Sequence, residues 1–284
     1  MNATASDPIV EDAHGNDDSL SIELIRRGLS TRDVGFELHL FTEVPSTNDV
    51  ACRLAKKGAR EGTAVLAEKQ RAGRGRFGHP WFSPGKANLY ASVIFRPPIA
   101  PSAVAVFSMI ASLALADAVT GEGVPASVRW PNDVVVSGRR IGGTLTVVAA
   151  VRDAVQHVVL GIGVNLNVSR EALAAALGPS AALATSVSEA AGRPIDRNRF
   201  AASLLNRLER WHDLYTGYGP DAVRAAWTQR DALRGRFVEV RGHTVEAGRA
   251  IGVDEGGQLI LESDAGHTLV AGGEITAIEG ERIR

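Results

Sequence analysis

Residues 70–81 read QRAGRGRFGHPW, and this stretch decides which kind of α/β fold the chain can adopt. Residues 73–78 match the Gly-x-Gly-x-x-Gly pattern of a dinucleotide-binding loop, and a predicted strand precedes them. His79-Pro80-Trp81 follows, and this run cannot open the helix whose N-terminus would hold a pyrophosphate. The stretch therefore argues against a Rossmann fold, and it lacks the Gly-Lys-Ser/Thr of a P-loop.

The same stretch carries Arg71, Arg74 and Arg76 on a chain interrupted by Gly73 and Gly75. Arginine presents a planar, permanently charged fork that suits phosphate or carboxylate, and glycine lets the backbone move. Such a loop is suited to cover an anionic ligand that must be kept from water. Taken alone, a short arginine–glycine loop is more often a solvated surface loop, so this interpretation needs support from the rest of the chain.

Two further motifs stand at the ends of predicted strands. Residues 128–133 read VRWPND, a tight turn that Arg129 and Arg140 flank in sequence, so that both can point toward an anion at the sheet. A plain turn with two exposed arginines explains this motif about equally well. Residues 161–167 read GIGVNLN, and glycines at a strand end let a ligand or a neighbouring strand approach the backbone closely.

Composition narrows the class of protein. The chain has 284 residues, a net charge of -1 and 45% hydrophobic residues, which favours a globular protein with two domains and excludes a general nucleic-acid binder. The single cysteine, Cys52, fits a reducing compartment. The apolar residues 100–116 are too few to span a bilayer and predict a buried helix, so we expect a cytoplasmic protein without a membrane segment. The seven histidines show no metal-ligand spacing, and no hydrolase elbow is present.

The pattern along the chain predicts three parts. Residues 1–34 are acidic and polar, and we expect a mobile tail with one short helix before folding begins near Phe36. Residues 35–232 alternate predicted strands and helices, and one helix is expected to start at Ser46, with Asp49 close to a capping box. Residues 233–284 are short strands separated by glycines, which predicts a small β-barrel.

Taken together, the motifs resemble the biotin protein ligase family. The resemblance covers most of the chain beyond the acidic tail, because the order and spacing of the motifs hold from about residue 40 to residue 167 and the small C-terminal barrel also matches. It implies an α/β (α+β) fold with a mixed central sheet flanked by helices, as in class II synthetases, and an SH3-like C-terminal barrel. The matching segments are Ser46-Thr47-Asn48, Gln70, residues 73–76, 81–84, 88–90 and 129–133, Arg140 with Gly143, and residues 161–165.

The resemblance also implies an activity and a set of site residues. Biotin and ATP, with Mg²⁺, would give biotinyl-adenylate, and the biotin would pass to a lysine on the biotin carboxyl carrier domain of an acetyl-CoA or acyl-CoA carboxylase. The biotin-binding residues would be Ser46, Thr47, Asn48, Gln70, Arg74, Gly75, Arg76 and Arg140. The adenylate-binding residues would be Gly73, Arg74, Arg76, Trp81, Arg129, Asn132, Asp133 and Asn165. Arg74, Arg76 and Arg140 would be catalytic, and Asp133 is a candidate metal ligand.

The sequence departs from the family pattern at three positions. Arg129 and Arg140 stand where lysine is usual, and His79 stands where the loop often has another arginine. A lipoate ligase and a non-enzymatic sensor of biotin or adenylate are therefore kept as alternatives. We expect the monofunctional type that does not bind DNA, because the residues before the predicted catalytic domain are few and acidic. A homodimer is left open.

Overall fold

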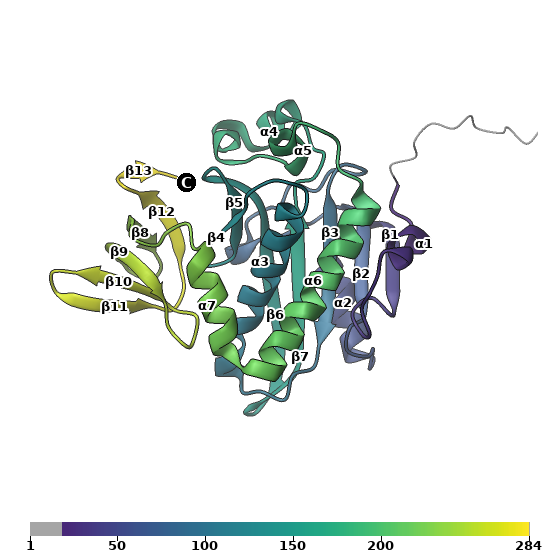
Figure 1. The fold of residues 1–284 in the computed structure, drawn as a ribbon, viewed down its shortest axis with the longest axis horizontal. Helices are drawn as coiled ribbons and strands as arrows, with labels where there is room; N and C mark the ends of the chain where they lie inside the picture. Colours follow the sequence, from purple (N-terminus) through teal and green to yellow (C-terminus); the bar gives the residue numbers. More distant parts are fainter. Residues whose placement is uncertain (1–18, 284) are drawn as a thin grey trace, which may run out of the picture.

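The computed structural model describes residues 19–283, which form a large mixed sheet with helices and a smaller C-terminal sheet (Figure 1). The seven strands of the large sheet run in the order β1-β2-β3-β7-β6-β5-β4. β1 and β2 are parallel, and every other neighbouring pair is antiparallel. The strands are β1 (Leu38–Val44), β2 (Ala64–Gln70), β3 (Leu89–Phe95), β4 (Ser127–Arg129), β5 (Asp133–Val136), β6 (Arg139–Val151) and β7 (Ala154–Val164). This mixed sheet confirms the predicted fold class.

Helices cover both faces of this sheet. On the face toward the viewer in Figure 1 lie α3 (Ala105–Thr120), α6 (Arg197–Tyr218) and α7 (Pro220–Arg230). The stretch Pro101–Thr120 has the length and apolarity to cross a membrane, but 72% of its most apolar window is buried, so it serves as the central core helix. On the opposite face, α2 (Thr47–Lys56) packs Val50, Ala51 and Ala55 against the sheet.

Short helices complete the large unit. They are α1 (Ile22–Arg27), η1 (Arg76–Gly78), η2 (Pro101–Ala103), α4 (Arg170–Leu177), η3 (Gly178–Leu183) and α5 (Val187–Ala191). The prediction of a capping box at the start of α2 was wrong. Ser46 occupies the N-cap position without a side-chain cap bond, and the Asp49 carboxylate instead accepts a hydrogen bond from Arg74.

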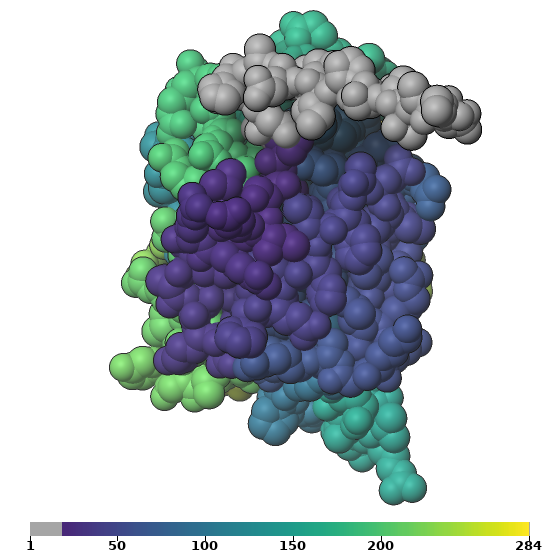
Figure 2. Space-filling model, turned by 90° about the vertical axis from the view of Figure 1, so that its right-hand side faces the viewer, coloured from purple at the N-terminus to yellow at the C-terminus, as the bar shows by residue number. Residues whose placement is uncertain are grey.

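The N-terminal segment, residues 19–34, differs from the expected tail. Leu20 and Ile25 are buried, and the Glu209 carboxylate of α6 accepts hydrogen bonds from the backbone amides of residues 32–34 at 2.6 to 2.8 Å. Figure 2 shows these purple residues packed on one side of the molecule, next to the green residues of the later helices. The prediction that folding begins near Phe36 was therefore wrong. The rest of the expected tail, residues 1–18, lies outside the described residues.

The C-terminal strands form one antiparallel sheet in the order β11-β10-β9-β8-β12-β13. They are β8 (Phe237–Arg241), β9 (Val245–Val253), β10 (Leu259–Ser263), β11 (Gly266–Val270), β12 (Glu274–Ile278) and β13 (Glu281–Arg282). The expected strands are present, and their pairing leaves β11 and β13 as edges. The sheet is fixed to the large unit by a hydrogen bond of 3.1 Å from Nε1 of Trp130 to the Gly257 carbonyl oxygen.

Candidate active site

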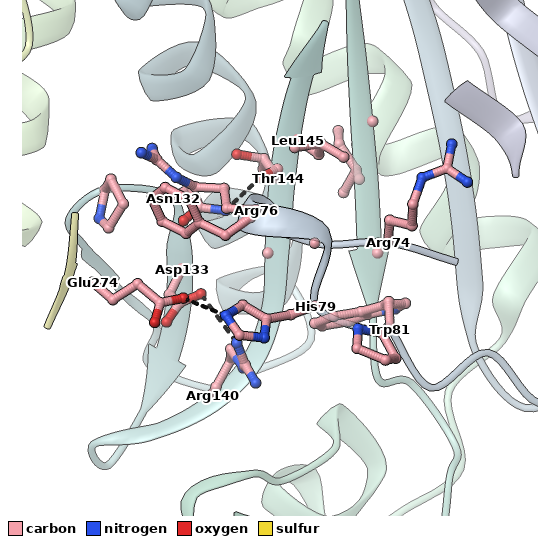
Figure 3. A pocket seen from close by; sticks show the side chains of 18 of the residues that line it. Arg74, Arg76, His79, Trp81, Asn132, Asp133, Arg140, Thr144, Leu145 and Glu274 are labelled. Atoms are coloured by element: carbon pink, nitrogen blue, oxygen red, sulfur yellow. Dashed lines mark hydrogen bonds and ion pairs between the residues drawn. The ribbon is translucent and has the colours of Figure 1, made fainter. Parts of the chain in front are cut away.

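A cavity of about 500 Å³ lies between the start of α2, the glycine–arginine loop (residues 71–80), the turn at residues 130–133 and the C-terminal sheet (Figure 3). Most of the residues predicted for the site line this one cavity. They are Ser46, Thr47, Asn48, Gln70, Arg74, Gly75, Arg76, Trp81, Arg129, Asn132, Asp133 and Arg140. Segments far apart in the sequence therefore converge on one cavity.

Glycines form the floor of the cavity. In the register of β6 with β7, Gly143 faces Gly163 and Leu145 faces Gly161, so these four residues share one face of the sheet. A Cβ atom at Gly161 would lie 2.2 Å from Oδ1 of Asn48, and one at Gly163 would lie 2.6 Å from Nε1 of Trp81. The glycines therefore let two cavity side chains lie directly on the backbone of β7.

A polar network occupies the end of the cavity near α2. Oε1 of Gln70 accepts a hydrogen bond of 2.9 Å from the Thr47 amide, and the Thr47 hydroxyl lies 3.2 Å from the same oxygen. The buried Ser92 hydroxyl lies 2.6 Å from Oδ1 of Asn48 and 2.8 Å from Oγ1 of Thr47. Nδ2 of Asn48 donates to the Leu145 carbonyl oxygen at 3.1 Å. This end holds amide and hydroxyl groups in fixed positions for a polar, uncharged ligand group.

Charged groups gather at the opposite end. The Arg129 guanidinium, with a side chain only 9% exposed, pairs with Oδ2 of Asp133 at 2.7 Å. Arg140 lies 3.7 Å from Oδ1 of the same carboxylate, and its guanidinium lies 5.6 Å from the centre of the Trp81 ring. Nδ2 of Asn132 donates to the Thr144 carbonyl oxygen and so ties the turn to β6. With Arg140 one-third exposed, this end keeps positive charge available to an anion.

The glycine–arginine loop crosses the cavity in a defined conformation. Its two arms are joined by hydrogen bonds of 2.8 Å from the Gly75 amide to the His79 carbonyl oxygen and from the Trp81 amide to the Gly73 carbonyl oxygen, and Arg74 pairs with Asp49 of α2. Phe77, at its tip, is 64% exposed and has a φ of 55°. The backbone of Phe77 is in the left-handed region and its large apolar side chain faces solvent, so this side chain does not anchor the loop.

Trp81 connects the loop to the cavity floor. Its Nε1 atom is buried and has no hydrogen-bond partner among the described residues, although it borders the cavity. A buried donor without a partner costs free energy, so an acceptor on a ligand would improve this site. The segment after Trp81 is held by Tyr90, whose hydroxyl donates to the Pro84 carbonyl oxygen at 2.9 Å. Burial raises the pKa of Tyr90 far above its usual value, so the hydroxyl stays protonated.

The C-terminal sheet also contributes to the cavity, which the sequence did not predict. Gly273, Glu274 and Ile283 line it, and Oε1 of Glu274 lies 2.9 Å from Nε2 of His79 (Figure 3). Further wall residues that were not predicted come from β6, β7, α4 and η3. They are Thr144, Leu145, Ile162, Ala176, Leu177, Ser180 and Leu183. No local sequence pattern indicates that a short C-terminal strand reaches the site. Only comparison with the complete fold of related proteins could have indicated it.

Two predicted residues lie outside the cavity lining. A Cβ atom at Gly73 would lie 2.5 Å from Oγ of Ser83, so this glycine permits close packing beneath the loop. Asn165 is buried, and its Nδ2 atom donates to the Thr185 carbonyl oxygen at 3.1 Å. In the structure both residues support neighbouring segments, and their predicted contacts with adenylate stay predictions.

Asp133 does not fit the role of a protein-held metal ligand. One carboxylate oxygen is paired with Arg129 and the other faces Arg140, so a cation would compete with two guanidinium groups. In the part of the chain that the structure describes, no three His, Cys, Asp or Glu residues are grouped to hold a metal ion. Any magnesium bound here would have to depend mainly on oxygens of a phosphate ligand.

The fold and the cavity together define a class: an α/β domain with an appended small sheet, whose cavity is lined by amide and hydroxyl groups at one end and by arginines at the other. A sequence model of the biotin/lipoate A/B protein ligase family matches residues 40–165. The chain is 34% identical to a biotin–[acetyl-CoA-carboxylase] ligase of Paracoccus denitrificans, over 83% of this chain and 98% of the relative. It is 31% identical to the enzyme of that name from Mycobacterium tuberculosis, over 90% of this chain and 93% of the relative.

Solved structures agree at the level of the fold. The biotin protein ligase of Aquifex aeolicus in complex with biotin and ATP superposes with a TM-score of 0.71 at 23% identity, over 86% of this chain and 98% of that chain.

A further relative by sequence is a bifunctional ligase/repressor, BirA of Bacillus subtilis, which is 34% identical over 87% of this chain and 76% of its own length. The chain belongs to the biotin/lipoate A/B protein ligase family.

Proposed function

We propose that the chain is an ATP-dependent biotin protein ligase. The observation that carries the proposal is the division of one cavity into two ends, the amide and hydroxyl network at Thr47, Asn48 and Gln70 and the arginines at the other end. Biotin has a ring system rich in hydrogen-bonding groups and an aliphatic chain that ends in a carboxylate. Its two ends match the two ends of the cavity, and the relatives named as biotin ligases support this choice.

In the first reaction, a biotin carboxylate oxygen attacks the α-phosphorus of ATP, a P–O bond forms and pyrophosphate leaves. Two anions must approach each other, so fixed positive charge lowers the barrier. We assign this role to Arg74, Arg76 and Arg140. Asp49 holds Arg74 beside the cavity, and Asp133 faces Arg140. Magnesium would enter as the counterion of the ATP phosphates.

In the second reaction, a lysine nitrogen attacks the carbonyl carbon of biotinyl-adenylate. A C–N bond forms, the C–O bond to phosphate breaks, AMP leaves and the amine loses a proton. Water would compete with the lysine, so the glycine–arginine loop has to cover the mixed anhydride until the acceptor arrives. Its position across the cavity supports this role.

The acceptor we propose is the biotin carboxyl carrier domain of an acetyl-CoA or acyl-CoA carboxylase. The names of the relatives from P. denitrificans and M. tuberculosis support it. A cytoplasmic location and the absence of DNA binding also belong to the proposal. The single cysteine supports the first, because the sequence contains no second cysteine for a disulfide.

The test is to incubate the purified chain with biotin, ATP, Mg²⁺ and a carboxylase carrier domain, and to measure the products by mass spectrometry. We expect biotinyl-adenylate, and one biotin added to a single lysine of the carrier. Transfer of lipoate in place of biotin would establish the lipoate ligase alternative. Binding of biotin without turnover would establish the sensor alternative.

A further inference from the structure

We propose that Glu274 is a positioning residue that fastens the glycine–arginine loop to the C-terminal sheet and so controls how long the adenylate is retained. This inference rests on the proposed function for its substrate. Its structural basis is the ion pair of 2.9 Å between Oε1 of Glu274, the first residue of β12, and Nε2 of His79 (Figure 3). The pair joins the glycine–arginine loop to the C-terminal sheet, and both segments border the same cavity.

The ion pair with Glu274 ties a loop side chain directly to a carboxylate of the C-terminal sheet. Phe77 at its tip is turned to solvent, so no apolar anchor pulls the loop down. Arg76 also lies over this edge, because a Cβ atom at Gly272 would be 3.6 Å from its Nη2 atom. Arg74 is fastened on the other side, to Asp49 of α2. The Glu274–His79 pair is therefore a contact that holds the far side of the loop against the C-terminal sheet.

The charge of Glu274 gives a second reason for the pairing. Its side chain is only 21% exposed and borders the cavity in which the proposed function places the anionic adenylate. An unpaired carboxylate in that place would repel the adenylate phosphate. While the loop is closed, Nε2 of His79 occupies Oε1 of this carboxylate. Closure of the loop and acceptance of the adenylate are therefore linked through one carboxylate.

The pair contributes little to global stability. The His79 side chain is 61% exposed, and ion pairs with an exposed partner have small effects on unfolding. The effect of breaking the pair should thus appear in the loop and not in the fold. This separates a positioning role from a merely structural one.

The chain offers a matched control in the same C-terminal sheet. Glu262 of β10 pairs with His267 of β11 at 3.6 Å, both side chains are more than half exposed, and neither lines the cavity. Glu262→Gln removes the same kind of contact at a distance from the loop.

The experiment loads the full chain with biotinyl-adenylate and measures its release and hydrolysis without a carrier domain. Glu274→Gln and His79→Gln should each speed release by about threefold to fivefold, as expected for loss of one such ion pair. The double variant His79→Glu/Glu274→His, which reverses the pair, should restore slow release. The KM for biotin and the melting temperature should change little, and Glu262→Gln should behave like the natural chain.

Unchanged release in Glu274→Gln, an equal change in Glu262→Gln, or no restoration in the reversed pair would overturn the proposal. A second measurement does not depend on the chemistry. Without ligand, Glu274→Gln should increase hydrogen exchange of the loop amides by a similar factor, and Glu262→Gln should not. If the natural chain forms no adenylate, the proposed function fails, and the exchange experiment still decides whether Glu274 holds the loop.

Discussion

Replacing Gly161 by alanine tests whether the glycine floor of the cavity is required. The added Cβ would lie 2.2, 2.6 and 2.7 Å from Oδ1, Nδ2 and Cγ of Asn48, closer than real contacts allow. β7 cannot retreat, because it is paired with β3 on one side and with β6 on the other. Asn48 must therefore move, which breaks its contacts with Ser92 and with the Leu145 carbonyl oxygen.

The magnitude follows from these two contacts. Each buried polar group left without a partner costs about 1–3 kcal/mol, so loss of the two contacts should lower the free energy of unfolding by about 2–6 kcal/mol. Movement of Asn48 also disturbs Thr47 beside it, so biotin should bind at least about tenfold more weakly. Urea unfolding and calorimetric titration with biotin measure the two effects.

Gly217→Ala is the matched control, because a Cβ atom there has nothing within 4 Å and the residue lies in α6. We expect it to leave biotin binding unchanged and to raise stability by up to about 1 kcal/mol. If Gly161→Ala unfolds and binds biotin as the natural chain does, the argument that the floor must be bare is wrong.

Two further predictions concern a charge at the site and a buried acid. Arg140→Ala should lower kcat for pyrophosphate release by about 10²–10³-fold, as for removal of one preorganised donor. Arg140→Lys should change kcat little, since the charge is preserved. A hundredfold rise of kcat in the lysine variant would contradict this reasoning. Burial raises the pKa of Asp231 from 3.8 to about 6. Between about pH 4 and pH 6 the folded chain therefore keeps a proton on Asp231 that the unfolded chain has lost. The free energy of unfolding falls as pH rises through this range. Asp231→Asn removes this cost, and in urea unfolding its gain over the natural chain should be larger at pH 8 than at pH 4.5 by up to about 3 kcal/mol; an equal gain at both pH values would refute the assignment.

Much of the fold and the site could be predicted from the sequence because the signals are local. Alternating strands with intervening helices gave the mixed sheet, and the proline after Gly78 argued against a Rossmann loop. The motifs at Gln70, Arg129 and Asn132 stand at or near strand ends, and these ends meet at one cavity. Short motifs with fixed backbone requirements therefore indicated the site before its three-dimensional arrangement was known.

Contacts between distant segments carried no such signal. Glu209 looks like an ordinary polar residue of a helix, yet its carboxylate binds the backbone of a segment about 177 residues earlier. Glu274 is one polar residue among several on short strands, and only the packing of the two sheets brings it to the cavity. The position of Asp49 in the sequence predicted a capping residue of α2. In the structure its carboxylate instead accepts a hydrogen bond from Arg74 of the loop.

The docking of residues 19–34 on α6 has a consequence for how the protein is made. A ribosome synthesises these residues early, but the Asn198 and Glu209 side chains that bind them are added some 175 residues later. Until then Leu20 and Ile25 have no apolar surface of α6 to cover them, and the growing chain presents them to solvent or to a chaperone. The first described segment to leave the ribosome is thus one of the last to reach its native partners, and it should become protected from proteases only after α6 has left the ribosome.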